Sequence, residues 1–210
     1  MDRIEEITAS YLLKIKAVKL QPKAPFTWAS GWKSPIYCDN RKTLSFPEIR
    51  KFIKEEFAAK VRSKYPEAEV IAGVATGAIA HGALVAEELN LPFIYVRPSA
   101  KGHGLGNQIE GVYGKGNKVV VIEDLISTGS SSLGAVKALR EEGCDVLGML
   151  AVFTYGFPEA AENFAKANCE LETLGNYNSL VDMAVKEGYI HENELETLRT
   201  WRKSPETWGM

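Results

Sequence analysis

The feature that most constrains the fold is a short apolar strand that leads, through two acids and a turn, into a helix. Residues Val119 to Ile122 are four consecutive apolar β-formers, a pattern typical of strands buried on both faces of a parallel sheet. Glu123 and Asp124 follow, and the small residues Ser127 to Ser131 then open an apparent amphipathic helix. A strand buried on both faces needs helices on each side of its sheet, so this segment predicts an α/β fold.

The alternation of strand and helix patterns continues through most of the chain, as expected for a parallel sheet flanked by helices. Predicted strands cover residues 70–75, 93–96, 118–123, 145–154 and 171–174. Predicted helices cover residues 2–20, 78–90, 130–142, 158–168, 179–187 and 192–202, with a further helix starting near Pro47. For 210 residues we expect a single domain, 1–210, with its core at about 67–175 and an N-terminal segment at about 1–45.

Composition excludes several classes of protein. The net charge is −2 with 25% charged residues, so we expect no bulk attraction to nucleic acid or to an anionic membrane. No apolar run reaches the roughly 18 residues of a membrane span, and the N-terminus does not resemble a signal peptide. The three cysteines, Cys38, Cys144 and Cys169, are far apart and odd in number. They predict reduced thiols in a cytoplasmic protein and neither disulfides nor a zinc site.

The turn after the acids has the composition of a phosphate seat. Free backbone N–H groups at a helix N-terminus bind anions, and hydroxyl groups at the same place add donors. Because acids repel phosphate, we expect Glu123 and Asp124 to hold sugar hydroxyls and a Mg²⁺ ion. The alternative is an ordinary capped turn. A cap needs one hydroxyl, however, and this turn has four within five residues.

A second candidate element is the long segment 97–117, which contains six glycines. Loops of this length in compact domains are usually functional or disordered, and glycine raises the entropy cost of ordering them. Its potential cations, Arg97, Lys101 and His103, cluster near its start. A mobile loop carrying them could close over a polyanion and exclude water. Taken alone, the same residues would suit a solvated surface loop.

Together, the strand, the acid pair and the turn resemble the phosphoribosyl pyrophosphate (PRPP) motif of type I phosphoribosyltransferases. Three further segments narrow the resemblance to the orotate phosphoribosyltransferase family. Arg97 to Gly104 resembles that family's catalytic loop, and Phe26 to Tyr37 resembles its base-covering N-terminal segment. Gly73 to Gly77 corresponds to its pyrophosphate loop. The resemblance implies a parallel sheet flanked by helices, with a small hood built from the N-terminal and C-terminal segments.

The resemblance also implies an activity. The 5-phosphoribosyl group would pass from PRPP to orotate, giving orotidine 5′-phosphate and pyrophosphate in de novo pyrimidine (UMP) biosynthesis. Catalysis would rest mainly on positioning and on stabilising the leaving group. Mg²⁺ would be the cofactor, bound through PRPP, with no direct protein ligand assigned. A homodimer is implied as well, with the 97–117 loop shared between its subunits.

The resemblance assigns roles to particular residues of this chain. Catalytic roles fall to Arg97, Lys101, His103 and Asp124. The same four residues would bind PRPP, together with Glu123, Leu125, Ile126, Ser127, Thr128, Gly129, Ser130 and Ser131. Ser127 would also contact orotate.

The chain departs from the family at several cationic positions. Some members have Lys at the positions of Ala29, Gly77 and Pro98, and others have Arg just after the strand that ends near Tyr155. Lys33 and Arg41 are therefore alternatives for binding the orotate carboxylate, since an Arg fork suits a carboxylate. Arg41 could equally be a solvent-facing charge.

Two other functions stay open at the level of sequence. A phosphoribosyltransferase for another base would share the PRPP turn. A non-catalytic PRPP-sensing regulator would share it too, but would need a basic DNA-reading domain.

Overall fold

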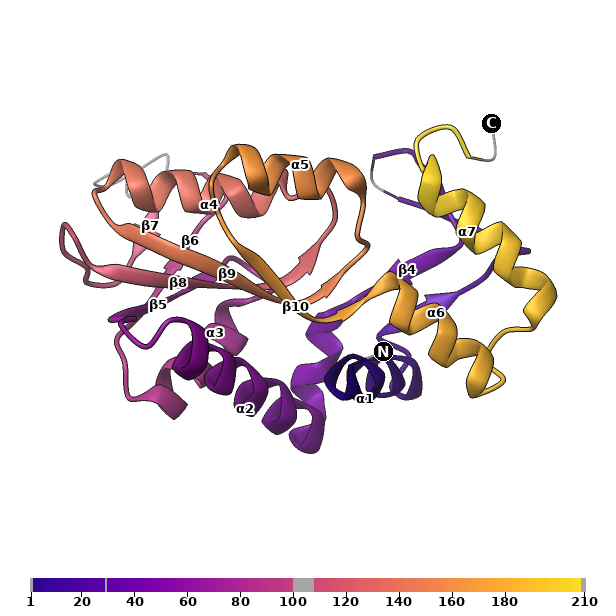
Figure 1. Cartoon of the computed structure of the whole chain (residues 1–210), viewed down its shortest axis with the longest axis horizontal. Coiled ribbons are helices and arrows are strands. Elements are labelled where there is room, and N and C mark those ends of the chain that lie inside the picture. The colour runs from indigo at the N-terminus through magenta and orange to yellow at the C-terminus, as the bar shows by residue number, and fades with distance from the viewer. Residues whose placement is uncertain (1, 29, 100–107, 209–210) are drawn as a thin grey trace.

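The computed structural model describes residues 2–28, 30–99 and 108–208 and places a six-stranded sheet at the centre of the protein (Figure 1). Its strand order is β10-β9-β8-β5-β6-β7. The strands are β5 (Val70–Val74), β6 (Phe93–Val96), β7 (Ile109–Glu110), β8 (Lys118–Ile126), β9 (Asp145–Thr154) and β10 (Leu171–Asn176). All neighbouring strands are parallel except β6 and β7, which are antiparallel.

Helices cover both faces of this sheet (Figure 1). On one face lie α4 (Ser130–Glu141) and α5 (Pro158–Lys166), and on the other lie α2 (Pro47–Lys64) and α3 (Ile79–Leu89). Strand β8 is buried against both layers, because Val119 and Val121 pack in the α4–α5 core while Val120 and Ile122 pack in the α2–α3 core. Burial on both sides explains why the strand is a continuous apolar run, and it confirms the predicted α/β fold.

The N-terminal and C-terminal segments together form a small hood beside the sheet, at the right of Figure 1. It comprises α1 (Arg3–Lys14), the paired strands β1 (Val18–Leu20) and β4 (Ile36–Cys38), the paired strands β2 (Phe26–Thr27) and β3 (Lys33–Ser34), and the 3₁₀ helix η1 (Asn40–Ser45) that follows β4. The C-terminal part adds α6 (Tyr177–Lys186), the 3₁₀ helix η2 (Glu192–Glu194) and α7 (Leu195–Lys203). At its centre the fully buried Trp201 contacts the rings of Trp28, Tyr155, Phe157 and Tyr177.

The N-terminal helix is shorter than the prediction of 2–20. It ends at Lys14, Lys16 adopts a left-handed backbone conformation (φ 55°), and Val18–Leu20 form strand β1 against β4. The apolar stripe that predicted the longer helix crosses two elements, because Ile4 and Tyr11 of α1 pack against the α2–α3 core while Val18 of β1 enters the hood core. The helical spacing of apolar residues therefore extends by coincidence from α1 into strand β1.

Two further predictions, for the strand that carries the acid pair and for segment 97–117, also need correction. Strand β8 runs on to Ile126, so Glu123 and Asp124 lie within it rather than after it. The segment 97–117 is not one loop, because Ile109–Glu110 pair with Tyr95–Val96 as an antiparallel edge strand. A two-residue strand is too short to show a period in the sequence. Lys101 and His103 lie outside the described residues.

Other element boundaries agree with the predictions more closely. The predicted strands at 93–96 and 145–154 match β6 and β9, and the helix predicted near Pro47 begins there. Within the described residues, no helix is both long and apolar enough to cross a membrane.

The packing of α2 on the sheet can be tested at Phe57, whose side chain is 0% exposed. Phe57→Ala should lower the free energy of unfolding by about 3–5 kcal/mol, because it removes buried apolar area and leaves a cavity. Urea unfolding followed by circular dichroism measures this change. The control is Phe46→Ala, at a residue that is 42% exposed, where we expect a change within about 0.5 kcal/mol. Equal losses in the two variants would contradict the packing.

Candidate active site

The acid pair lies at the edge of a cavity of about 440 Å³, but its two members have different surroundings. Glu123 is only 5% exposed, and both of its carboxylate oxygens already accept hydrogen bonds. Oε2 accepts from Ser132 Oγ at 2.7 Å and Oε1 accepts from the backbone N–H of Asp124 at 2.8 Å. Burial, followed by the nearby charge of Asp124, raises the pKa of Glu123 well above its usual range. Glu123 therefore stabilises the end of the strand Lys118–Ile126 through two buried hydrogen bonds.

The carboxylate of Asp124 lies against the turn that follows β5. A Cβ atom at Gly77 would overlap all three carboxyl atoms of Asp124, so this position accommodates glycine alone while Asp124 is in place. The backbone carbonyl of Asp124 accepts a hydrogen bond of 2.6 Å from the side-chain amide of Asn40, a buried hood residue 84 positions earlier in the chain. The backbone of Asp124 is thus held by a distant segment, and its carboxylate packs beside Gly77.

The hydroxyl-rich turn is held from behind by α5 and β9. Gly129 adopts a left-handed conformation (φ 82°), and a Cβ there would overlap the Phe164 ring. Asn163 donates from its side-chain amide to the Thr128 carbonyl at 3.0 Å. The carbonyl of Ile126 accepts from the N–H of Tyr155 at 3.1 Å. Helix α4 then begins at Ser130, so its first N–H groups are available to an anion at the turn.

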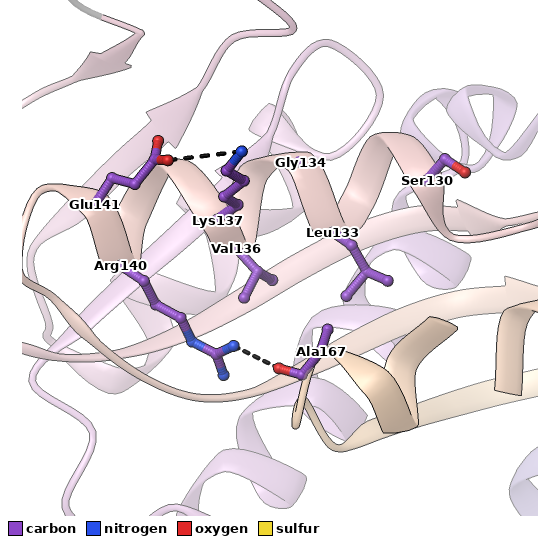
Figure 2. A pocket seen from close by; sticks show the side chains of 8 residues that line it. All are labelled: Ser130, Leu133, Gly134, Val136, Lys137, Arg140, Glu141 and Ala167. Atoms are coloured by element: carbon purple, nitrogen blue, oxygen red, sulfur yellow. Dashed lines mark hydrogen bonds and ion pairs between the residues drawn. The ribbon is translucent and has the colours of Figure 1, made fainter. Parts of the chain in front are cut away.

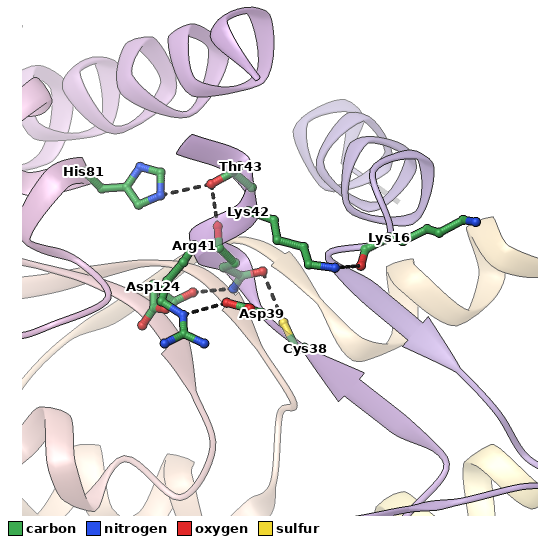
Figure 3. Close-up of polar contacts among 9 residues, drawn as sticks. Lys16, Cys38, Asp39, Arg41, Lys42, Thr43, His81 and Asp124 are labelled. Atoms are coloured by element: carbon green, nitrogen blue, oxygen red, sulfur yellow. Dashed lines mark hydrogen bonds and ion pairs between the residues drawn. The ribbon is translucent and has the colours of Figure 1, made fainter. Parts of the chain in front are cut away.

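Segment 38–43 of the hood closes one side of the cavity through a polar network (Figure 3). Arg41 Nε donates to Asp39 Oδ1 at 2.6 Å, and Thr43 Oγ1 lies 3.1 Å from Nε2 of His81 on α3. Burial lowers the pKa of His81 to about 4, so this histidine is neutral at physiological pH. The contact between Thr43 and His81 therefore joins the hood to α3 through two uncharged side chains.

Arg97 begins the segment predicted to be the catalytic loop. Its N–H donates to the Gln108 carbonyl at 2.9 Å, and Gln108 Nε2 donates back to the Arg97 carbonyl at 2.9 Å. Residues 97 and 108 are therefore joined by two hydrogen bonds. Arg97 also lines a second cavity, of about 180 Å³, together with Ser130 and Ser131. This arrangement brings the predicted loop cation to the predicted phosphate turn.

The structure brings several sequence-predicted residues together and leaves others apart. Asp124, Leu125, Ser131 and Arg41 line the 440 Å³ cavity, where the turn of Ala75 to Gly77 faces them. Lys33 is elsewhere: its Nζ donates to Thr27 Oγ1 at 2.8 Å within the β2–β3 hairpin.

Sequence reasoning missed Asn40, His81 and Asn163, which position the site through hydrogen bonds to other segments. Asn40 stands in the polar run Asp39 to Lys42, and this run was a usable signal. His81 and Asn163 sit in ordinary amphipathic helices, where no local pattern distinguishes them.

A larger cavity, of about 640 Å³, lies along the outer side of α4 (Figure 2). Its charged side chains already have partners: Lys137 pairs with Glu141 at 3.7 Å and Arg140 donates to the Ala167 carbonyl at 2.6 Å. It contains neither member of the Glu123–Asp124 pair. The chemistry of the site therefore belongs to the smaller cavity.

A parallel sheet whose central strand carries an acid pair and ends in a hydroxyl-rich turn defines a phosphoribosyl-binding α/β protein. Residues 44–187 match the family model of the phosphoribosyl transferase domain. The chain is 61% identical over 208 residues to the orotate phosphoribosyltransferase of Phocaeicola vulgatus, covering 99% of this chain and 98% of that protein. It is 59% identical to that of Porphyromonas gingivalis over the full length of both. The chain belongs to the orotate phosphoribosyltransferase family.

A solved structure agrees with this assignment. The crystal structure of orotate phosphoribosyltransferase from Aeropyrum pernix superposes with a TM-score of 0.74 at 30% identity. The match covers 87% of this chain and 99% of that one.

The environment of Glu123 predicts a pH effect on stability. The unfolded chain releases this proton near pH 4.3, whereas the folded protein retains it to higher pH, so stability should fall as the pH rises above that value. Glu123→Gln cannot titrate, and its decline between pH 4.5 and 8, measured as urea midpoints, should be about 1 kcal/mol or more smaller. The exposed Glu159→Gln controls for net charge. Equal slopes for wild type and Glu123→Gln would show that Glu123 ionises in its ordinary range.

Proposed function

We propose that this protein transfers the 5-phosphoribosyl group from PRPP to orotate, giving orotidine 5′-phosphate and pyrophosphate in pyrimidine biosynthesis. The observation that carries the proposal is the cavity shared by Asp124, Ser131 and the turn of Ala75 to Gly77. It combines an acid for sugar hydroxyls, a phosphate seat and a glycine turn at one edge of the sheet. Identity to orotate phosphoribosyltransferases over nearly the whole chain supports orotate as the base.

The substrate PRPP would lie along the carboxyl edge of β8. The segment from Ile126 to Ser131 would seat the 5′-phosphate with N–H and hydroxyl donors. Asp124 would accept hydrogen bonds from the ribose hydroxyls, with the buried Glu123 behind it. Arg97, Lys101 and His103 would surround the pyrophosphate.

The reaction breaks the bond between ribose C1 and the pyrophosphate oxygen and forms a bond from C1 to orotate N1. Positive charge develops on the ribose and negative charge on the leaving group. The proton on N1 can pass to the departing pyrophosphate or to solvent as the bond forms, so no basic side chain is required at N1. The residues therefore position the two reactants and stabilise the departing charge, which is where preorganised cations contribute most.

Mg²⁺ would neutralise oxygens of the leaving pyrophosphate. Within the described residues no group of three or more His, Cys, Asp or Glu side chains could hold a metal ion. Mg²⁺ usually keeps several waters and binds through one or two carboxylates plus substrate phosphates. Asp124, at the cavity wall, offers a carboxylate of that kind.

Orotate would bind between Ser127 and the base-covering segment. That segment is fixed in place, since Trp28 Nε1 donates to the Ile36 carbonyl at 3.0 Å and its ring lies 5.1 Å from that of Tyr155. The homodimer with segment 97–117 acting across subunits is part of this proposal, supported by the family resemblance. A cytoplasmic location stays a prediction from the scattered cysteines, all free in the structure.

Base selectivity tests the proposed reaction directly. Incubated with PRPP and Mg²⁺, the protein should release pyrophosphate with orotate and not with uracil or adenine. Asp124→Asn should lower kcat/KM for PRPP by about 10-fold or more, because the loss of a charged hydrogen bond costs about 1.5–3 kcal/mol. Equal turnover of adenine would contradict the orotate assignment, and an unchanged Asp124→Asn variant would remove the acid from the site.

Mixed dimers test whether segment 97–117 works across the subunit boundary. Lys101→Ala and Asp124→Asn, each expected to be strongly impaired alone, are unfolded and refolded together in equal amounts, so that half of the dimers are mixed. If Lys101 acts in the partner's site, each mixed dimer has one intact site, and about a quarter of wild-type sites should return. The activity of separately refolded variants is the background. Demonstrated heterodimers without activity would show that Lys101 serves its own subunit.

A further inference from the structure

Arg41 carries a positive charge in a cavity whose other charged side chains, among the described residues, are acids. Among the described residues around the 440 Å³ cavity, the charged side chains are Asp39, Arg41, Glu123 and Asp124. The remaining lining residues are uncharged. A cation placed on this wall is well located for a ligand anion that has to enter beside carboxylates.

A hydrogen bond from one nitrogen of its guanidinium orients the Arg41 side chain. Its Nε donates to Asp39 Oδ1 at 2.6 Å, and within the described part of the chain neither terminal nitrogen has a hydrogen-bond partner (Figure 3). The side chain is 62% exposed, so a ligand in the cavity can reach it. A guanidinium held in this way presents its two terminal nitrogens to an oxyanion with little further loss of rotamer freedom.

The neighbouring turn cannot supply a cation of its own. Gly77 has no side chain, and a Cβ there would overlap the Asp124 carboxylate in its present position. Arg41 reaches the same cavity from the hood and faces the turn of Ala75 to Gly77. Within the described residues, the N–H groups of Thr76 and Gly77 donate to no protein acceptor, so the turn itself offers further donors.

We propose that Arg41 binds the pyrophosphate group of PRPP. The proposal rests on the proposed PRPP transfer and adds a residue to it. Position favours pyrophosphate over the orotate carboxylate, because Arg41 shares its cavity with Thr76 and Gly77 whereas Ser127, the expected orotate contact, is not among the lining residues.

The competing explanation is an ordinary surface ion pair between Asp39 and Arg41. Exposed pairs of this kind stabilise a protein by about 0–1 kcal/mol and bind nothing. Either explanation expects Arg41→Gln to fold normally. The two differ in what the variant does to pyrophosphate.

The experiment uses Arg41→Gln and Arg41→Lys, with Lys42→Gln as the matched control. Lys42 is adjacent in sequence, but its Nζ donates to the Lys16 carbonyl at 3.0 Å, away from the cavity (Figure 3). Calorimetric titration with Mg²⁺ and inorganic pyrophosphate measures binding without any base. Kinetics then give KM for PRPP and for orotate, and inhibition by ribose 5-phosphate, which lacks the pyrophosphate.

Arg41→Gln should weaken pyrophosphate binding and raise KM for PRPP by similar factors, about 10-fold or more, the size expected for a charge-assisted hydrogen bond. KM for orotate and inhibition by ribose 5-phosphate should stay within about twofold of wild type. Arg41→Lys should fall between the two, since it keeps the charge and loses the fork. Lys42→Gln should behave as wild type.

Two outcomes would overturn the proposal. A rise in KM for orotate with unchanged pyrophosphate binding would assign Arg41 to the base. Unchanged values throughout would leave the surface ion pair. If wild type binds pyrophosphate but does not turn over orotate, the proposed function fails and the Arg41 test still gives an answer, because the titration needs no orotate.

Discussion

The contact between the Asp124 carboxylate and the backbone of Gly77 is the constraint on which the arrangement of the site depends. It brings the end of β8 against the turn after β5, two strands that are neighbours in the sheet. Gly73 and Gly82 extend the same close packing, because a Cβ at Gly73 would overlap the Ala78 carbonyl and one at Gly82 would overlap the Phe93 ring. Glycines therefore set how near α3 and its turn come to the acid on β8. A wider spacing would separate the acid from the turn that we expect to face pyrophosphate.

The hood contributes to this site as well as covering it. Asn40 holds the Asp124 carbonyl, Thr43 contacts His81 on α3, and Arg41 lies between them on the cavity wall. These three residues follow directly after the base-covering segment. The 3₁₀ helix η1 (Asn40–Ser45) therefore links that segment to the backbone of Asp124, and in the proposed reaction it would couple base binding to ribose positioning.

The parts of the fold that could be predicted are those with strong local patterns. The apolar run of β8, buried on both faces, and the ten-residue strand β9 were readable because burial alone dictates their composition. The β1 strand was hidden in a helical stripe, and β7 is too short to have a period. In the site, the acids and the turn were readable as a motif. The different environments of Glu123 and Asp124 depend on Ser132 and Gly77, which only the fold brings near.

The environments of the two acids change the electrostatics that the sequence indicates. Two adjacent carboxylates beside a phosphate seat would repel PRPP strongly if both were ionised. Glu123 is buried with its oxygens occupied, and its raised pKa lets it keep its proton to higher pH than an ordinary glutamate. In the proposed transfer the ribose of PRPP would lie beside Asp124, while Arg41 and Arg97 line the two cavities that share Ser131. We therefore expect the burial of Glu123 to reduce the repulsion that a polyanion would meet beside Asp124.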